Sequence, residues 1–218
     1  DGDTTYLYAA VLANGIYRSS NNGQTWENLT QNVEWIQTIL NSEDYEEYTN
    51  INNNMLISCC KTHQNVLYII IVQDGISSAL AYTEDYGVNW IRMDNPSTHD
   101  TYGYIQYLTP TSNKDGTPKV NFKTGAQGAI HLSLYAHPNN EFLVYAGGDR
   151  VPEIDGEDGI FGAGNWTSRL FRGNREYSPM INYESTSEQL SHQWAIITNR
   201  NDIPIEQDGI NYGGLTRG

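Results

Sequence analysis

The chain has 218 residues, with 12 Lys and Arg against 26 Asp and Glu, which gives a formal net charge of −14. Such an excess of negative charge repels nucleic-acid phosphates and anionic membrane surfaces, so neither is an expected partner. No run of about 18 apolar residues predicts a membrane span. The charge suits a secreted protein kept soluble by self-repulsion, and a start at Asp1 fits either a processed product or a fragment.

The composition favours strands over helices. Sixteen Tyr, five Trp and twenty Gly occur without an amphipathic helical pattern of more than two turns, which predicts an all-β chain. The two cysteines, Cys59 and Cys60, are adjacent. Neighbouring residues on a strand point to opposite faces, so we interpret them as two small strand residues and not as a disulfide.

In chain order, the first conspicuous feature is a turn that occurs twice. SSNNGQTW supplies Ser19, Asn21, Gly23, Thr25 and Trp26, and TEDYGVNW supplies Thr83, Asp85, Gly87, Asn89 and Trp90 at matching positions. Glycine permits a positive φ, and the Asn or Asp side chain accepts hydrogen bonds from amides of its own turn. The hydroxyls hold the strand ends, and we expect each Trp to pack between sheets. The motif is therefore predicted to be structural.

The remaining sequence divides into units of the same kind. Alternating apolar segments separated by turn residues predict blades at about 4–32, 54–94, 128–185 and 190–218, with long polar loops at 41–54 and 94–126. The expected strands include 15–20 in the first blade and 66–73 and 78–84 in the second. Within the third blade they are 129–138, 141–150, 168–174 and 178–184, and 191–199 would open the fourth. Four-stranded antiparallel repeats predict a β-propeller. About three and a half blades cannot close a ring, so we expect a partial propeller belonging to a longer polypeptide.

The two turns resemble the Asp-box of the bacterial neuraminidase repeat, Ser-x-Asp-x-Gly-x-Thr-Trp, which is typical of sialidase-like and sortilin-like propellers. The later segments GAQGAIHLSLYAHPNNEFLVYAGGDR, RLFRG, SHQW and QDG are similar to sortilin-like and xyloglucanase-like repeats of large secreted bacterial proteins. This resemblance implies a propeller, with a His opening each inner strand, and an extracellular or cell-surface location. It implies no single activity. The Arg-Ile-Pro motif of sialidases is absent from the sequence, so sialidase activity is not expected.

Six polar residues are candidates for chemistry at the propeller channel. They are His131, Asp149, Arg150, Arg172, His192 and Asp208. Asp149 and Asp208, at equivalent places in two repeats, could act as the acid and base of a glycosidase, with Trp166 and Trp194 as sugar-stacking platforms. The alternative is that Asp149 accepts turn amides and pairs with Arg150, and that the His residues are structural.

Other site types are weakly indicated. Asp155, Glu157 and Asp158 lie in an acidic loop that could bind Ca²⁺, but it lacks the full calcium-loop spacing, so the favoured interpretation is a solvated acidic loop. No cofactor is expected. The main prediction is a non-catalytic extracellular propeller that serves as a structural or binding module for protein or glycan, with other subunits of a surface or filamentous assembly as further partners. The alternative is a glycoside hydrolase acting on polysaccharide.

Overall fold

The protein is described by a computed structural model covering residues 5–41, 53–73, 75–99, 105–107, 128–150, 168–180, 183, 191–197, 206–207 and 210–211. The strands are β1 (Leu7–Val11), β2 (Gly15–Ser19), β3 (Glu27–Asn28), β4 (Asn54–Cys59), β5 (Leu67–Gln73), β6 (Ile76–Thr83), β7 (Ile91–Met93), β8 (Ser97–His99), β9 (Ile105–Tyr107), β10 (Ser133–Ala136), β11 (Leu143–Arg150), β12 (Ser168–Asn174), β13 (Trp194–Ile196), β14 (Glu206–Gln207) and β15 (Ile210–Asn211). Two short helices, α1 (Glu34–Leu40) and α3 (Gly128–His131), accompany them.

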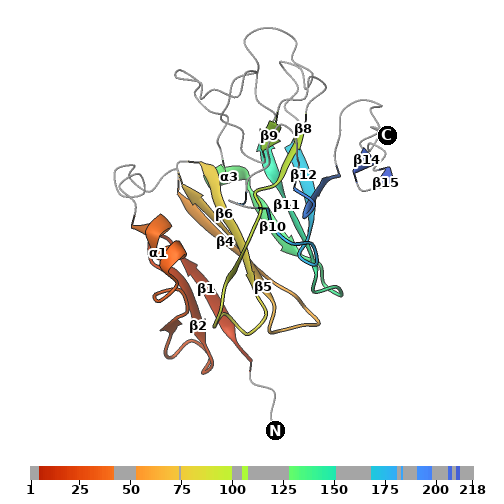
Figure 1. Ribbon diagram of the computed structural model, residues 1–218. Helices are drawn as coiled ribbons and strands as arrows, with labels where there is room; N and C mark the ends of the chain where they lie inside the picture. The colour runs from red at the N-terminus through yellow and green to blue at the C-terminus, as the bar shows by residue number, and fades with distance from the viewer. Residues whose placement is uncertain are drawn as a thin grey trace.

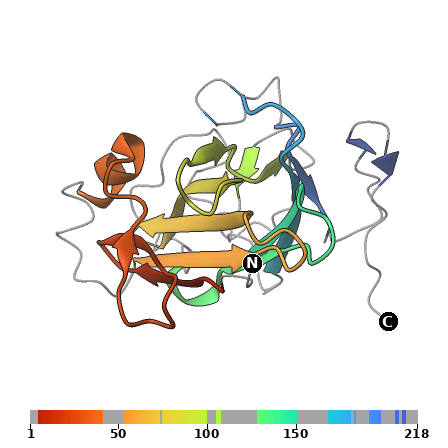
Figure 2. The same cartoon turned by 90° about the horizontal axis from the view of Figure 1, so that it is seen from below.

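Three larger sheets carry the described fold. Sheet one is β1-β2-β3, sheet two is β4-β5-β6-β7, and sheet three is β10-β11-β12-β13, each an antiparallel meander in chain order. The pairs β8-β9 and β14-β15 are separate two-stranded ribbons. Viewed from the side and from below, the larger sheets follow one another as layers, with sheet two in the middle (Figures 1 and 2). The prediction of an all-β chain is confirmed, and none of the described helices is long and apolar enough to cross a membrane.

The centre of the stack is β5, which is buried along nearly its whole length on both faces. Leu67, Ile69 and Ile71 contribute to one hydrophobic core, shared with Ile16 and other side chains of sheet one. The alternate residues Tyr68, Ile70 and Val72 contribute to a second core, shared with sheet three. Because successive side chains of a strand point to opposite faces, an uninterrupted apolar run places one core on each side of sheet two.

Sheets one and two repeat the same local register. Leu7 is paired with Ser19 in sheet one, and Leu67 is paired with Thr83 in sheet two, so the last strand residue before each repeated turn has an equivalent partner. The predicted strands at 15–20, 66–73 and 78–84 therefore correspond to β2, β5 and β6. The match extends to the faces, since Tyr8, Ala10 and Leu12 pack toward sheet two just as Tyr68, Ile70 and Val72 pack toward sheet three.

Sheet three differs from the sequence prediction at its fourth strand. We expected 178–184 there, but β13 pairs with β12 instead, and the described residues 178–180 and 183 form no strand. Trp194 explains the choice, because its ring lies over Gly173, where an added Cβ would come within 2.7 Å of the indole. The indole Nε1 also donates to the Asp94 carbonyl at 2.7 Å. The strand beginning near 191 thus completes sheet three and does not open a further one.

The second repeated turn adds specific contacts to the apolar core between sheets one and two. Leu29, which follows β3, packs on Gly87 so closely that an added Cβ would lie 2.4 Å from its Cδ1 atom. Arg18 Nη1 donates to the Tyr86 carbonyl at 3.0 Å, and the rings of Tyr6 and Tyr86 have centroids 5.2 Å apart. Gly87 has φ +93°, so it both permits the turn and leaves room for the neighbouring sheet.

The two turn glycines provide a matched pair of substitutions. Gly23 also has a positive φ, +83°, but its nearest contacts to an added Cβ are at 3.7–4.0 Å. Ala at either position is expected to cost about 1–2 kcal/mol for the left-handed backbone. Gly87→Ala should cost roughly 1–3 kcal/mol more, because it also displaces Leu29. Denaturant unfolding of both variants measures this difference, and equal losses would show that Leu29 does not depend on the glycine.

Candidate functional site

The first repeated turn uses its polar side chains internally. Ser19 Oγ donates to Asn21 Oδ1 at 2.9 Å and accepts the Gly23 amide at 2.9 Å. Asn21 Oδ1 also accepts the Thr25 amide at 2.9 Å, while Asn21 Nδ2 donates to Thr25 Oγ1 at 2.8 Å. Trp26 Nε1 donates to the Gly23 carbonyl at 3.1 Å. These bonds agree with the structural role that the sequence predicts.

The second turn repeats these bonds with a carboxylate at the centre. Thr83 Oγ1 donates to Asp85 Oδ1 at 2.7 Å and accepts the Gly87 amide at 3.0 Å. Asn89 donates its amide N–H to Asp85 Oδ1 at 2.9 Å and its side-chain Nδ2 to Asp85 Oδ2 at 2.7 Å. The tryptophans differ, because Trp90 is buried in the core between sheets one and two, whereas Trp26 is 42% exposed. The expectation that both pack between sheets holds for Trp90 alone.

The hydrogen bonds around Asp85 shift its ionisation. Partial burial raises the pKa of Asp85, but donation from the Asn89 amide, the Thr83 hydroxyl, the Asn89 side chain and the Val88 amide outweighs burial, so the pKa lies below its usual value. The carboxylate is thus held ionised by its own turn, as expected for a structural group.

A cluster of charged and aromatic groups joins sheets two and three. The Arg175 guanidinium, whose side chain is 3% exposed, pairs with Glu84 and donates from Nη2 to Glu141 Oε2 at 2.8 Å. Its Nε donates to the Glu141 carbonyl at 2.9 Å. The rings of Tyr82 and Phe142 lie on the guanidinium, each with its centroid 4.8 Å from Cζ. This arginine, buried between two rings and bonded through all three of its nitrogens, acts as a clamp between sheets two and three.

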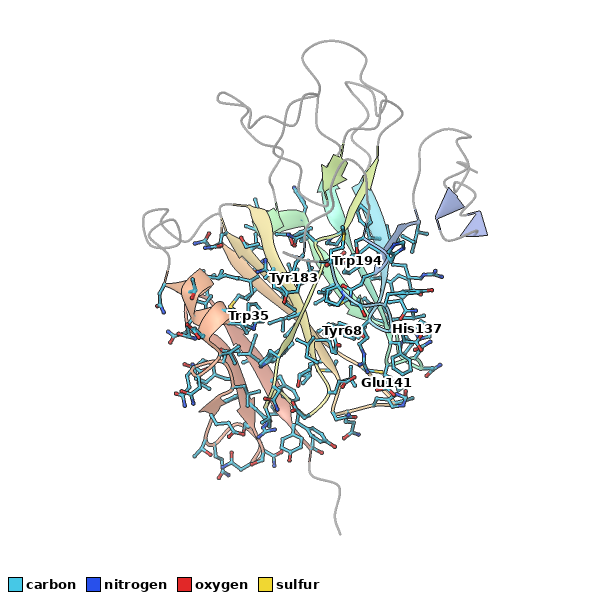
Figure 3. The ribbon with its side chains drawn as sticks, in the orientation of Figure 1. Trp35, Tyr68, His137, Glu141, Tyr183 and Trp194 are labelled. Carbon is cyan, nitrogen blue, oxygen red and sulfur yellow. The ribbon has the colours of Figure 1, made fainter. Side chains whose placement is uncertain are left out.

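Tyr68 and His63 extend this cluster. Tyr68 Oη donates to the Glu141 carbonyl at 2.5 Å, and burial raises the pKa of Tyr68 (Figure 3). His63 Nε2 lies 3.7 Å from Glu141 Oε1 and its Nδ1 lies 3.8 Å from Cys60 Sγ. The Cys60 thiol is buried and points to the His137 carbonyl at 3.3 Å, whereas Cys59 is exposed. Neither cysteine forms a disulfide, and the burial of the Cys60 thiol favours packing over nucleophilic chemistry.

A second cluster of hydrogen-bonded polar groups connects the end of β7 with the segment before β13. The fully buried Asp94 carboxylate accepts Ser191 Oγ at 2.5 Å and the Met180 amide at 2.8 Å. Gln193 Oε1 accepts the Asp94 amide at 2.8 Å. The residues of this cluster and of the Arg175 clamp were missed by the sequence reasoning. Their hydrogen bonds join positions 34 to 99 apart, so no local spacing signals them.

The structure places the predicted channel residues at different ends of sheet three. His131 ends α3, so it precedes β10 and does not open it, and it is exposed. Asp149 and Arg150 end β11 on the same side, beyond the pair Ser133–Gly147. His192 lies beyond the opposite end, next to the pair Gly173–Trp194, so it is not the counterpart of His131.

The other predicted site residues lie within sheet three or outside the described residues. Arg172 lies between Tyr145 and Ala195 in the middle of sheet three. Trp194 is 1% exposed, so it cannot act as a sugar-stacking platform. Trp166, Asp208 and the acidic residues Asp155, Glu157 and Asp158 lie outside the described residues, as do the side chains of Asp149 and Arg150. Within the described part of the chain, no three His, Cys, Asp or Glu residues gather where they could hold a metal ion.

No protein-family model matches the chain, and no curated protein matches it. Among solved structures, it is similar to the GH74 xyloglucanase from Xanthomonas campestris, with a TM-score of 0.33 and 10% sequence identity. The alignment covers 88% of this chain and 27% of the xyloglucanase chain, so the protein spans about a quarter of that structure. This likeness is too low to assign a fold family or an activity. The class of protein that the structure defines is an all-β chain of antiparallel sheets.

The Asp85 carboxylate predicts a pH dependence of stability. Because its folded pKa is lower than its unfolded value of about 3.9, the stabilising contribution is complete above that pH and is lost as the pH falls through the folded pKa. Asp85→Asn should therefore unfold with less acid dependence below about pH 4 than the parent chain. Asn21→Asp, at the matching position of the first turn, is the converse control and should gain such a dependence. Chemical unfolding from pH 2 to 7 tests both, and an unchanged acid slope for Asp85→Asn would contradict the prediction.

The Arg175 clamp predicts a large stability loss on removal of the cation. Arg175→Met leaves the Glu141 carboxylate, 26% exposed, without its guanidinium and should cost about 3–5 kcal/mol. Arg175→Lys keeps the charge but lacks the planar guanidinium that bonds both glutamates, so the loss of stability should be smaller than for Arg175→Met. Glu84→Gln, at a half-exposed partner, should cost about 1 kcal/mol or less. Urea unfolding gives all three values, and a Met variant as stable as Glu84→Gln would show that the clamp contributes little.

Proposed function

We propose that the three larger sheets are consecutive blades of a β-propeller segment, and that this segment is a non-catalytic extracellular module that binds protein or glycan. Blade character is supported by the meander order of each sheet, by the shared register of sheets one and two, and by the two cores on the opposite faces of sheet two. A rigid stack of blades holds its connecting loops in fixed positions, which suits recognition.

One observation carries the non-catalytic part of the proposal. The described carboxylates at the turns and between the sheets are occupied by partners within the fold. Asp85 is held by its turn, Asp94 by Ser191 and the Met180 amide, and Glu84 and Glu141 by Arg175. A glycosidase needs two carboxylates facing each other across a gap that admits the substrate and, in inverting enzymes, a water. Among the described residues, these four carboxylates serve structural roles instead.

The binding part of the proposal draws on the loop sequences. The segments 41–54 and 94–126 are rich in Asn and Tyr, including Tyr45, Tyr48, Tyr102 and Tyr104. Tyrosine supplies a large contact area at low entropic cost, and Asn supplies adaptable hydrogen bonds. We expect the ligand contacts to lie in these segments, outside the short strands β8 and β9 that the second one contains.

A hydrolysis assay tests the proposal against the glycosidase alternative. The purified chain is incubated with a panel of soluble and insoluble polysaccharides, and reducing ends and retention on the insoluble ones are measured. We expect the parent chain to release no more reducing ends than a double variant, Asp149→Asn with Asp208→Asn, because the proposal gives neither carboxylate a catalytic role. Tyr45→Ala with Tyr48→Ala should weaken any retention roughly tenfold, as the loss of aromatic anchors does in other interfaces.

Hydrolysis of a polysaccharide by the parent chain would contradict the proposal. Release of reducing ends by the parent chain that the double Asp variant abolishes would identify a glycoside hydrolase and overturn the non-catalytic proposal. If the Tyr variants are retained on the polysaccharides as strongly as the parent chain, the binding surface lies outside the segment 41–54.

A further inference from the structure

The face of sheet one that points away from sheet two is apolar and exposed. Leu7, Ala9 and Val11 alternate along β1 with the residues that pack toward sheet two, and Tyr17 lies opposite Ala9 on β2. Leu7 and Val11 are each 40% exposed, and Trp26 beside them is 42% exposed. In the described part of the chain this is the outer side of the stack.

The register shows what covers such a face elsewhere in the same chain. Leu7, Ala9, Val11 and Tyr17 have Leu67, Ile69, Ile71 and Ala81 as their equivalents in sheet two, because Leu7–Ser19 matches Leu67–Thr83. Those four residues are buried by sheet one, at 1% exposure or less. The surface that covers them is therefore the inner face of another sheet with the same register.

The first turn has the same shape as the turn that sheet one engages. In the second turn, Gly87 receives the Leu29 side chain, and the Tyr86 carbonyl receives the Arg18 guanidinium. In the first turn, Gly23 and Asn22 occupy these positions with left-handed φ values of +83° and +57°, close to the +93° and +61° of Gly87 and Tyr86. Among the described residues, the nearest contacts of an added Cβ at Gly23 would be Trp26 and Leu7, both of which are exposed. The turn thus presents the same receiving surface without a described neighbour.

Sheet three carries the complementary residues at its far side. Ile197 donates its amide to the Leu170 carbonyl at 2.7 Å, as Leu29 donates to the Ile16 carbonyl at 2.8 Å. Arg172 lies two residues after Leu170, as Arg18 lies two residues after Ile16. Because Val144, Ala146 and Phe171 face sheet two, the row Tyr135–Tyr145–Arg172 faces away from it. Tyr135 is 57% exposed there.

We infer that the far face of sheet three, with Tyr135, Arg172 and Ile197, docks on the outer face of sheet one of a second copy of this chain. The contact is heterologous, since two different faces meet, so it continues head to tail as a ring or an open filament. The Ile197 side chain takes the place of Leu29 over the glycine of the turn, here Gly23, and Arg172 lies on the same docking face. The inference concerns the ends of the stack and does not depend on the proposed recognition role of the loops.

Two substitutions of exposed residues each block one of the two docking faces. Leu7→Arg places a charge on the outer face of sheet one, and Tyr135→Arg places one on the far face of sheet three. Both parent residues are exposed, so the fold is expected to survive, and circular dichroism with thermal unfolding checks this. The control is Ile130→Arg, because Ile130 is 71% exposed on α3, a helix that contacts sheet two and β11 and lies outside both faces.

Sedimentation velocity over a concentration series up to about 1 mM, the range of weak specific contacts, gives the test. The parent chain and Ile130→Arg should associate progressively, and each blocked variant alone should be monomeric. An equimolar mixture of Leu7→Arg and Tyr135→Arg should form a 1:1 dimer, because each partner contributes its one intact face. A monomeric parent chain overturns the inference, as does association of either blocked variant alone. Two monomeric variants that fail to pair in the mixture overturn the head-to-tail geometry.

Discussion

The burial of β5 on both faces is the constraint on which the rest of the structure depends. An exposed Val, Leu or Ile forfeits about 1.5–3 kcal/mol of transfer free energy, so a run such as LYIIIVQ requires apolar cover on two sides. Sheet one supplies the cover for Leu67, Ile69 and Ile71, and sheet three supplies it for Tyr68, Ile70 and Val72. The layered order of the three sheets is thus a consequence of one strand that has no solvent face.

The repeated turn makes this layering feasible at the sheet edge. Its hydroxyl, amide and carboxylate groups bond to one another and to the turn amides, so these groups stay paired when the turn lies against a neighbouring sheet. The glycine then leaves space for the leucine of that sheet. The first turn has the same internal bonds but an exposed tryptophan, which shows that the bonds alone do not bury the turn. Burial comes from the neighbouring sheet.

The contact between sheets two and three combines the apolar core with two buried polar groups. Arg175 between two glutamates and Asp94 between Ser191 and Gln193 each need several partners in place at once. Buried charges of this kind add less net stability than apolar packing of the same volume, but they penalise every arrangement in which a partner is missing. They therefore favour this pairing of sheets over shifted ones, and they select β13 as the last strand of sheet three.

By itself the sequence determined the all-β class, the repeated turn with its internal hydrogen bonds, and the strands around 15–20, 66–73 and 78–84. These features depend on neighbours within a few residues or on period-two alternation, both of which are visible in one dimension. Only the tertiary structure decided that β13 belongs to sheet three, that His131 ends a helix, that Trp26 is exposed and Trp90 buried, and that Arg175 and Asp94 are the polar groups between sheets. Each of these outcomes depends on side chains that lie tens of residues apart in the sequence, and their proximity follows only from the packing of one sheet on the next.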